Sequence, residues 1–124
     1  TLMVLWGLME QPFMRADPRV RRATSFLVGR FFKRNPHSNF YQHEKNWKAM
    51  RYPPNKCGGL VALYVMTKIG VGAEEPRMEE PIKWLMSARY RDGFWTEADR
   101  PHTEAGQWLT LMAILTLDRY SKGL

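Results

Sequence analysis

Hydrophobic and polar residues follow helical spacing along the chain, and two kinds of segment alternate. Residues 2–10, 59–69 and 103–120 carry apolar side chains almost all round, which is typical of helices buried in a core. Residues 18–34 and the segment that opens at Glu75 carry charged side chains on one face, which is typical of helices at a surface. The order buried, surface, buried, surface, buried predicts two layers of helices, and no segment shows a strong strand pattern.

The boundaries of these helices carry local signals. Asp17 is an N-cap residue, and Pro18 sits at the first helical position, where its missing N–H costs nothing. Pro81 places the regular start of the fourth helix near Glu80, because proline is tolerated only in the first turn. Residues 35–56 are polar and aromatic, and we expect a long loop of functional interest there.

An internal repeat relates the helix pairs to one another. One constant shift along the sequence places Leu2, Leu5, Trp6, Asp17, Pro18, Arg19, Phe26 and Leu27 on Leu60, Leu63, Tyr64, Glu75, Pro76, Arg77, Trp84 and Leu85. A second, shorter shift places Gly58, Ala62 and Leu63 on Gly106, Thr110 and Leu111. We therefore expect one domain over residues 1–124, with repeat units of about 1–57, 58–104 and 105–124 that stack on one another.

One motif carries a family resemblance. Trp84 and Leu85 are followed by Gly93 and Trp95, with Arg89 where a glutamine is usual, and this resembles the repeat motif of the terpenoid cyclase and protein prenyltransferase superfamily. The resemblance implies an all-α fold of α/α toroid-like helical repeats, a partial ring with about two and a half inner/outer helix pairs. It also implies a clasp in which Arg89 bridges a helix end and the next segment, while an indole stacks on its guanidinium.

Composition and charge narrow the classes of function. The formal net charge of +7 favours anionic partners. We expect the strongest basic cluster to be the solvated face of an outer helix, and we do not expect nucleic-acid binding, because no aromatic residue interleaves on that face. The cluster consists of Arg15, Arg19, Arg21, Arg22, Arg30, Lys33 and Arg34.

Length and cysteine content bear on location. The longest apolar stretches fall short of the roughly 18 residues that indicate a membrane span, so we expect none. Cys57 is the single cysteine, which fits a reducing compartment, and we expect a cytoplasmic protein. Because the first apolar run has no capping residue before it, we expect the chain to belong to a longer protein.

The resemblance also directs attention to a metal site. Protein prenyltransferases hold zinc with Asp, Cys and His ligands, and Cys57 and His102 stand at comparable places, with Asp99 or Glu104 as an oxygen ligand. The family's Asp-x-Cys spacing is absent, because Asn55 stands where the aspartate would be. We expect no cofactor, with zinc as the alternative.

Acidic and aromatic residues bear on two further kinds of site. The four aspartates stand far apart in sequence, so the chain lacks the Asp-x-Asp-Asp cluster with which squalene-hopene-type cyclases protonate a polyene. Aromatic and donor side chains predict a pocket for an apolar, anionic ligand such as an isoprenoid or lipid, and packing against the open rim is the alternative. The pocket candidates are Tyr41, His43, Trp47, Lys56, Trp95, His102 and Glu104.

Taken alone, the sequence favours a non-catalytic helical-repeat structural or interaction module. The alternatives are an isoprenoid-processing enzyme, of the prenyltransferase or terpene cyclase kind, and an isoprenoid- or lipid-binding domain. Inner helices that are hydrophobic on all sides cannot face water cheaply, so we expect a homodimer or contact with the remainder of a longer chain. The residues expected to contribute to a dimer contact are Leu2, Leu5, Trp6, Trp108, Met112 and Leu115.

Overall fold

The computed structural model describes residues 2–33, 44–52, 58–90, 92–97 and 103–122, and these residues form helices and connecting turns without a strand. The all-α class predicted from the sequence is therefore confirmed. The elements are α1 (Leu2–Leu8), the 3-10 helix η1 (Pro12–Ala16), α2 (Pro18–Val28), α3 (Glu44–Trp47), α4 (Gly59–Ile69), the 3-10 helix η2 (Pro76–Met78), α5 (Glu79–Ser87) and α6 (Glu104–Lys122).

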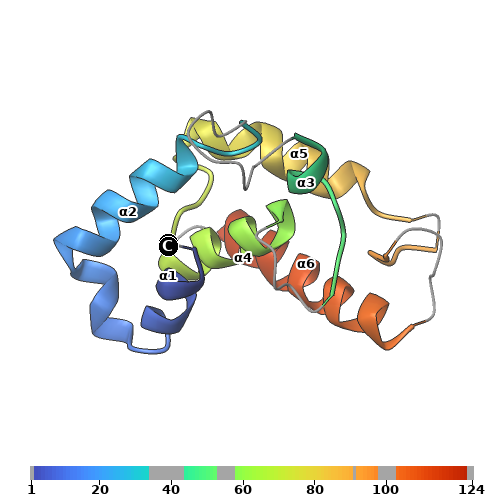
Figure 1. The fold of residues 1–124 in the computed structure, drawn as a ribbon, viewed down its shortest axis with the longest axis horizontal. Coiled ribbons are helices and arrows are strands. Elements are labelled where there is room, and N and C mark those ends of the chain that lie inside the picture. Colours follow the sequence, from blue (N-terminus) through green and yellow to red (C-terminus); the bar gives the residue numbers. More distant parts are fainter. Residues whose placement is uncertain (1, 34–43, 53–57, 91, 98–102, 123–124) are drawn as a thin grey trace.

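Helix α4 occupies the centre of the core. It packs most extensively on α6 and also contacts α1, α3 and α5. Figure 1 shows α2 and α5 forming an arch along one side of the molecule, with α1, α4 and α6 beneath it. We call α1, α4 and α6 the inner helices and α2 and α5 the outer helices, and this arrangement agrees with the two layers expected from the hydrophobic pattern.

Several boundaries differ from the sequence-based ones. Helix α1 ends at Leu8 rather than at residue 10, and Pro12 begins η1. Helix α2 ends at Val28 rather than near residue 34, because the chain continues in turns until Phe32, whose φ of 58° lies in the left-handed region. Helix α5 begins at Glu79, and Pro81 lies buried in its first turn, where its missing N–H has no helical partner to lose.

Both outer helices start with the same arrangement of an acid, a proline and an arginine. Asp17 Oδ1 accepts a hydrogen bond from the backbone N–H of Arg19 at 2.8 Å, and Glu75 Oε1 accepts one from Arg77 at 3.1 Å. Each guanidinium also folds back onto its acid, with Arg19 Nη2 to Asp17 Oδ2 at 2.8 Å and Arg77 Nη2 to Glu75 Oε2 at 2.9 Å. These capping carboxylates satisfy N–H groups that have no partner within the helix.

The inner helices α1 and α4 meet through equivalent positions. The rings of Trp6 and Tyr64 contact edge to face, with centroids 5.5 Å apart. The next such pair, Glu10 and Lys68, forms a salt bridge, and the two residues are related by the same shift that places Trp6 on Tyr64. The repeat therefore relates residues that touch each other in space.

We predict that the two capping acids make stability depend on pH in acid. Hydrogen bonds from the Arg19 side chain lower the pKa of Asp17 from 3.8 to about 2, and those from Arg77 lower the pKa of Glu75 from 4.5 to about 2. Because each folded-state pKa lies below the unfolded one, the stabilisation is present above pH 4.5 and is lost as the pH falls towards about 2. Thermal melts should show the Tm decreasing as the pH falls between these values.

The double variant Asp17→Asn, Glu75→Gln provides the control. Asparagine is itself a good N-cap residue, so helix capping by position 17 is retained while both titrations are removed. Its Tm should change less than that of the parent chain over the same pH range. An equal loss of Tm in parent and variant would contradict an acid sensitivity that arises at these caps.

Candidate functional site

Trp95 joins the end of α5 to α6. Its side chain is 4% exposed, and its indole Nε1–H donates to the carbonyl oxygen of Leu85 at 2.8 Å. Its backbone N–H donates to Thr110 Oγ1 at 3.0 Å, and that hydroxyl in turn donates to the Trp95 carbonyl at 3.2 Å. Gly93, with a φ of 90°, makes the turn that brings the tryptophan back onto α5. We call this set of contacts the Trp95 clasp.

The other residues of the motif, Trp84, Leu85 and Arg89, do not make the contacts that the resemblance implies. Leu85 is fully buried and supplies the carbonyl of the clasp, but Arg89 is exposed, and the bridging bonds come from Trp95 and Thr110 instead. Stacking of the Arg89 guanidinium on an indole does not occur among the described contacts. Trp84 packs on a different neighbour, the ring of Phe32, with centroids 5.2 Å apart.

Trp47 forms a second clasp in the preceding unit. It is 3% exposed, and its indole Nε1–H donates to the carbonyl oxygen of Lys33, beyond the end of α2, at 3.0 Å. Its own carbonyl oxygen lies where a Cβ on Gly59 would approach to 2.6 Å, so α4 requires glycine there. Trp47 and Trp95 are related by the same shift that places Gly58 on Gly106. That correspondence is the sequence signal by which the second clasp could have been found.

Two of the pocket candidates lie in the core. Trp47 and Trp95 are buried, and their indole N–H groups bond backbone carbonyl groups. Glu104 lies exposed in the first turn of α6. The remaining candidates for a pocket or a metal site lie outside the described residues: Tyr41, His43, Lys56, Cys57, Asp99 and His102. Within the described ranges, no group of three or more His, Cys, Asp or Glu side chains is placed to hold a metal ion.

A cleft lies between the end of α2, α3 and α5. It has a volume of about 830 Å³, within the range of small-molecule sites. Phe31, Phe32 and Trp84 supply aromatic lining. The polar lining is mainly cationic and consists of Lys33, Lys48, Arg77, Lys83, Glu80 and Ser87.

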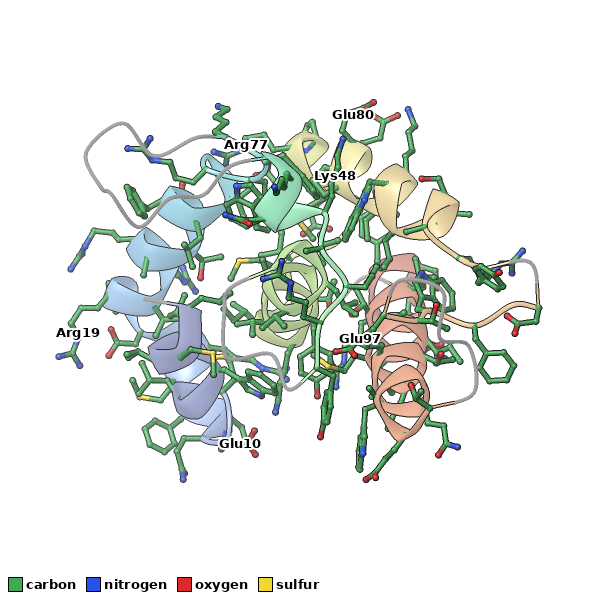
Figure 2. All side chains as sticks on the ribbon, turned by 45° about the vertical axis from the view of Figure 1, so that its right-hand side comes forward. Glu10, Arg19, Lys48, Arg77, Glu80 and Glu97 are labelled. Atoms are coloured by element: carbon green, nitrogen blue, oxygen red, sulfur yellow. The ribbon has the colours of Figure 1, made fainter. Side chains whose placement is uncertain are left out.

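Charge pairs surround this cleft. Figure 2 shows Lys48, Arg77 and Glu80 along the edge where α3 and α5 approach the end of α2. The Arg77 guanidinium is paired with Glu75, and Lys83 Nζ lies 2.8 Å from Glu79. The Lys83–Glu79 pair is largely exposed and hence weak, so an anion that enters the cleft can compete for Lys83.

A second candidate site is formed by opposite faces of the inner helices. Each face consists of three equivalent positions in every inner helix. The A face contains Leu2, Leu5 and Leu8 in α1, Leu60, Leu63 and Met66 in α4, and Trp108, Leu111 and Ile114 in α6. The B face contains Met3, Val4 and Gly7 in α1, Val61, Ala62 and Val65 in α4, and Leu109, Thr110 and Ala113 in α6. At about 100° per residue the two sets lie on opposite sides of a helix.

The exposure of these faces changes along the chain. The A face is at most 3% exposed in α4 but 45–51% exposed in α6. The B face is at most 8% exposed in α4 and α6, whereas Met3 and Val4 in α1 are 48% and 64% exposed. Among the described residues, α4 contacts two inner helices, α1 and α6, whereas α1 and α6 each contact one inner helix, α4. Each end of the array therefore exposes the face that a further neighbour would cover.

This pattern corrects the surface expected for a dimer. Leu2, Leu5 and Met112 are buried within the chain and offer no outer surface, while Trp6 and Leu115 are half-buried. Of the six expected residues, Trp108 is exposed, and even its ring is partly covered by Tyr52, stacked at a centroid distance of 6.2 Å. A helix that is apolar all round in sequence need not be buried all round.

Comparisons with known proteins give no family for the chain. It matches no family model, no curated protein and no solved structure. None of the described helices has the length and apolar character needed to cross a membrane. Functional inference therefore depends on the geometry of the clasps, the cleft and the two exposed faces.

We predict that loss of either clasp destabilises the fold. Trp95→Ala and Trp47→Ala should each lower the free energy of unfolding by about 3–5 kcal/mol, the usual cost of removing a buried large aromatic side chain. Trp95→Phe should lower it by about 1–3 kcal/mol, because the Leu85 carbonyl loses its partner. Urea unfolding followed by circular dichroism gives these values.

Phe13→Ala is the matched control. Phe13 is 72% exposed, so its truncation should change stability by no more than about 0.5 kcal/mol. The clasp interpretation is wrong if the Trp95 and Trp47 variants unfold at the same urea concentration as this control.

Proposed function

We propose that the chain is a non-catalytic helical-repeat structural or interaction module, which packs further helices onto the A face of α6 and the B face of α1. One observation carries the proposal. The A-face positions that are buried in α4 are open in α6, although the side chains are as apolar in both helices. Apolar patches of this kind on a folded surface mark sites of interaction.

The repeated local structures support the finer description of the module. The acid-Pro-Arg caps recur under the shift that places Leu2 on Leu60, and the tryptophan clasps recur under the shift that places Gly58 on Gly106. The Trp95 clasp ties the end of α5 to α6, and Trp47 ties the chain beyond α2 to the start of α4. We therefore propose α/α toroid-like repeats, with about two and a half inner/outer pairs, and membership of the terpenoid cyclase and prenyltransferase superfamily.

The same substitution at equivalent positions of α4 and α6 tests the proposal. Leu111→Glu places a carboxylate on an exposed face, so the melting curve in dilute solution should stay within about 0.5 kcal/mol of the parent chain. Leu63→Glu places it at a site that is 0% exposed, where an unpaired charge is very costly, and the cooperative melt should be lost.

Concentration provides the second part of that test. If the exposed faces bind other helices, the Tm of the parent chain should rise with protein concentration, whereas the Tm of Leu111→Glu should not. The proposal is overturned if Leu111→Glu unfolds the chain, because the A face of α6 would then belong to its own core.

The cleft between α2 and α5 supports a second candidate function, the binding of an isoprenoid or lipid with an anionic head group. Its aromatic lining suits an apolar chain, and Lys33, Lys48, Arg77 and Lys83 suit a phosphate. The parent chain should bind an isoprenyl diphosphate in calorimetry and bind the corresponding uncharged alcohol more weakly.

Reversing the charge of the cleft tests this second function. Lys33→Glu, Lys83→Glu should weaken diphosphate binding by roughly ten-fold or more, which corresponds to about 1.4 kcal/mol. Lys122→Glu makes the matched control, because Lys122 is exposed at the far end of α6 and is not part of the cleft lining. Equal affinities in the cleft variant and the parent chain would exclude the cleft as the site.

A further inference from the structure

We infer that the partner of each exposed face is a second copy of this chain, docked head to tail, with the A face of α6 in one copy against the B face of α1 in the other. This inference rests on the proposed function, because it names the occupant of the faces on which that function depends. Three observations carry it.

The first observation is the order in which the faces are covered. The A face is buried in α1 at Leu2 and Leu5 and in α4, the two helices that an inner helix follows. The B face is buried in α4 and α6, the two helices that an inner helix precedes. Along the array, each helix thus has its A face towards the next unit and its B face towards the previous one. A helix fitted to the open A face of α6 has to present a B face.

The second observation is that the chain itself offers a free B face. Met3 and Val4 of α1 are 48% and 64% exposed, and Gly7 beside them is exposed too. The α1 helix of a second copy therefore carries a B face that can cover the A face of α6. Its residues stand at positions equivalent to the B-face residues of α4 and α6.

The third observation is the difference in size between the two faces. The A faces carry large side chains, with Leu60, Leu63 and Met66 in α4 and Trp108, Leu111 and Ile114 in α6. The B faces carry smaller side chains at seven of nine positions, with Leu109 and Met3 as the larger members. The smaller residues are Val61, Ala62 and Val65 in α4, Thr110 and Ala113 in α6, and Val4 and Gly7 in α1. Large residues interdigitate with small ones at native packing density, while two A faces would crowd each other. The pairing is therefore heterologous, and not the same patch on both copies.

Blocking one face at a time tests the direction of this contact. Val4→Glu disables the B face and leaves the A face intact, and Ile114→Lys does the reverse. Both positions are more than half exposed, so both variants should keep the parent fold, which circular dichroism checks. In sedimentation experiments at micromolar concentration the parent chain should associate, and each variant alone should sediment as a 14.6 kDa monomer.

The mixture of the two variants gives the decisive result. In an equimolar mixture, the intact A face of Val4→Glu meets the intact B face of Ile114→Lys, so association should return, beginning with a dimer of twice 14.6 kDa. A Met86→Glu variant, changed at a residue of α5 that is 61% exposed, should associate like the parent chain. It controls for a general effect of an added charge.

Other outcomes overturn the inference in distinguishable ways. If Val4→Glu alone dimerises and Ile114→Lys does not, two A faces pair, and the head-to-tail inference fails while the interaction module stands. The opposite result means that two B faces pair, with the same consequence. If the parent chain remains monomeric throughout, no second copy binds, and the equivalent substitutions at Leu63 and Leu111 still decide whether the A face of α6 is a surface or part of the core.

Discussion

The burial of α4 on every side is the constraint on which the rest of the structure depends. Nine of its eleven residues are buried, and a helix of this kind is stable in water only when other helices cover all of its faces. Helices α1, α5 and α6 do so from different directions. Gly59 allows the turn that contains Trp47 to approach the start of α4 closely, so the loop after α2 contributes to the same core.

The two clasps convert this packing into a fixed order of helices. The last carbonyl groups of a helix have no partner within it, and the Trp95 indole N–H supplies one to Leu85 of α5. The Trp47 indole N–H bonds the carbonyl of Lys33, beyond the end of α2. The strained backbone of Phe32 serves the same purpose. Its positive φ carries a cost of order 1–3 kcal/mol, and it is held where the Phe32 ring packs on Trp47 at 5.7 Å and on Trp84.

The sequence predicted α1, α2, α4, α5 and α6 because spacing and capping are local properties, but it did not predict α3, which lies in the segment expected to be a loop. Asp17 caps α2 as expected, and Glu75 caps η2, the 3-10 helix that leads into α5. Helical periodicity shows which residues of a helix are apolar, but it cannot show whether another helix covers them. The sequence therefore does not distinguish Trp108 and Leu111 from Leu60 and Leu63, although Leu60 and Leu63 are buried and Trp108 and Leu111 are exposed. The Trp84 motif indicated a clasp but not its chemistry, since the hydroxyl that completes it belongs to Thr110 on the following inner helix.

The open faces link the stability of the chain to its assembly. Leu111 and Ile114 each leave about half of their surface in water, and burying apolar area contributes roughly 25 cal/mol per Å². The chain alone does not gain this burial free energy at Leu111 and Ile114, but it would gain it if another helix covered the A face of α6. Because only the folded state presents these faces in register, such binding stabilises the fold by mass action. Any helix that covers the A face of α6 would therefore add to the stability of the fold.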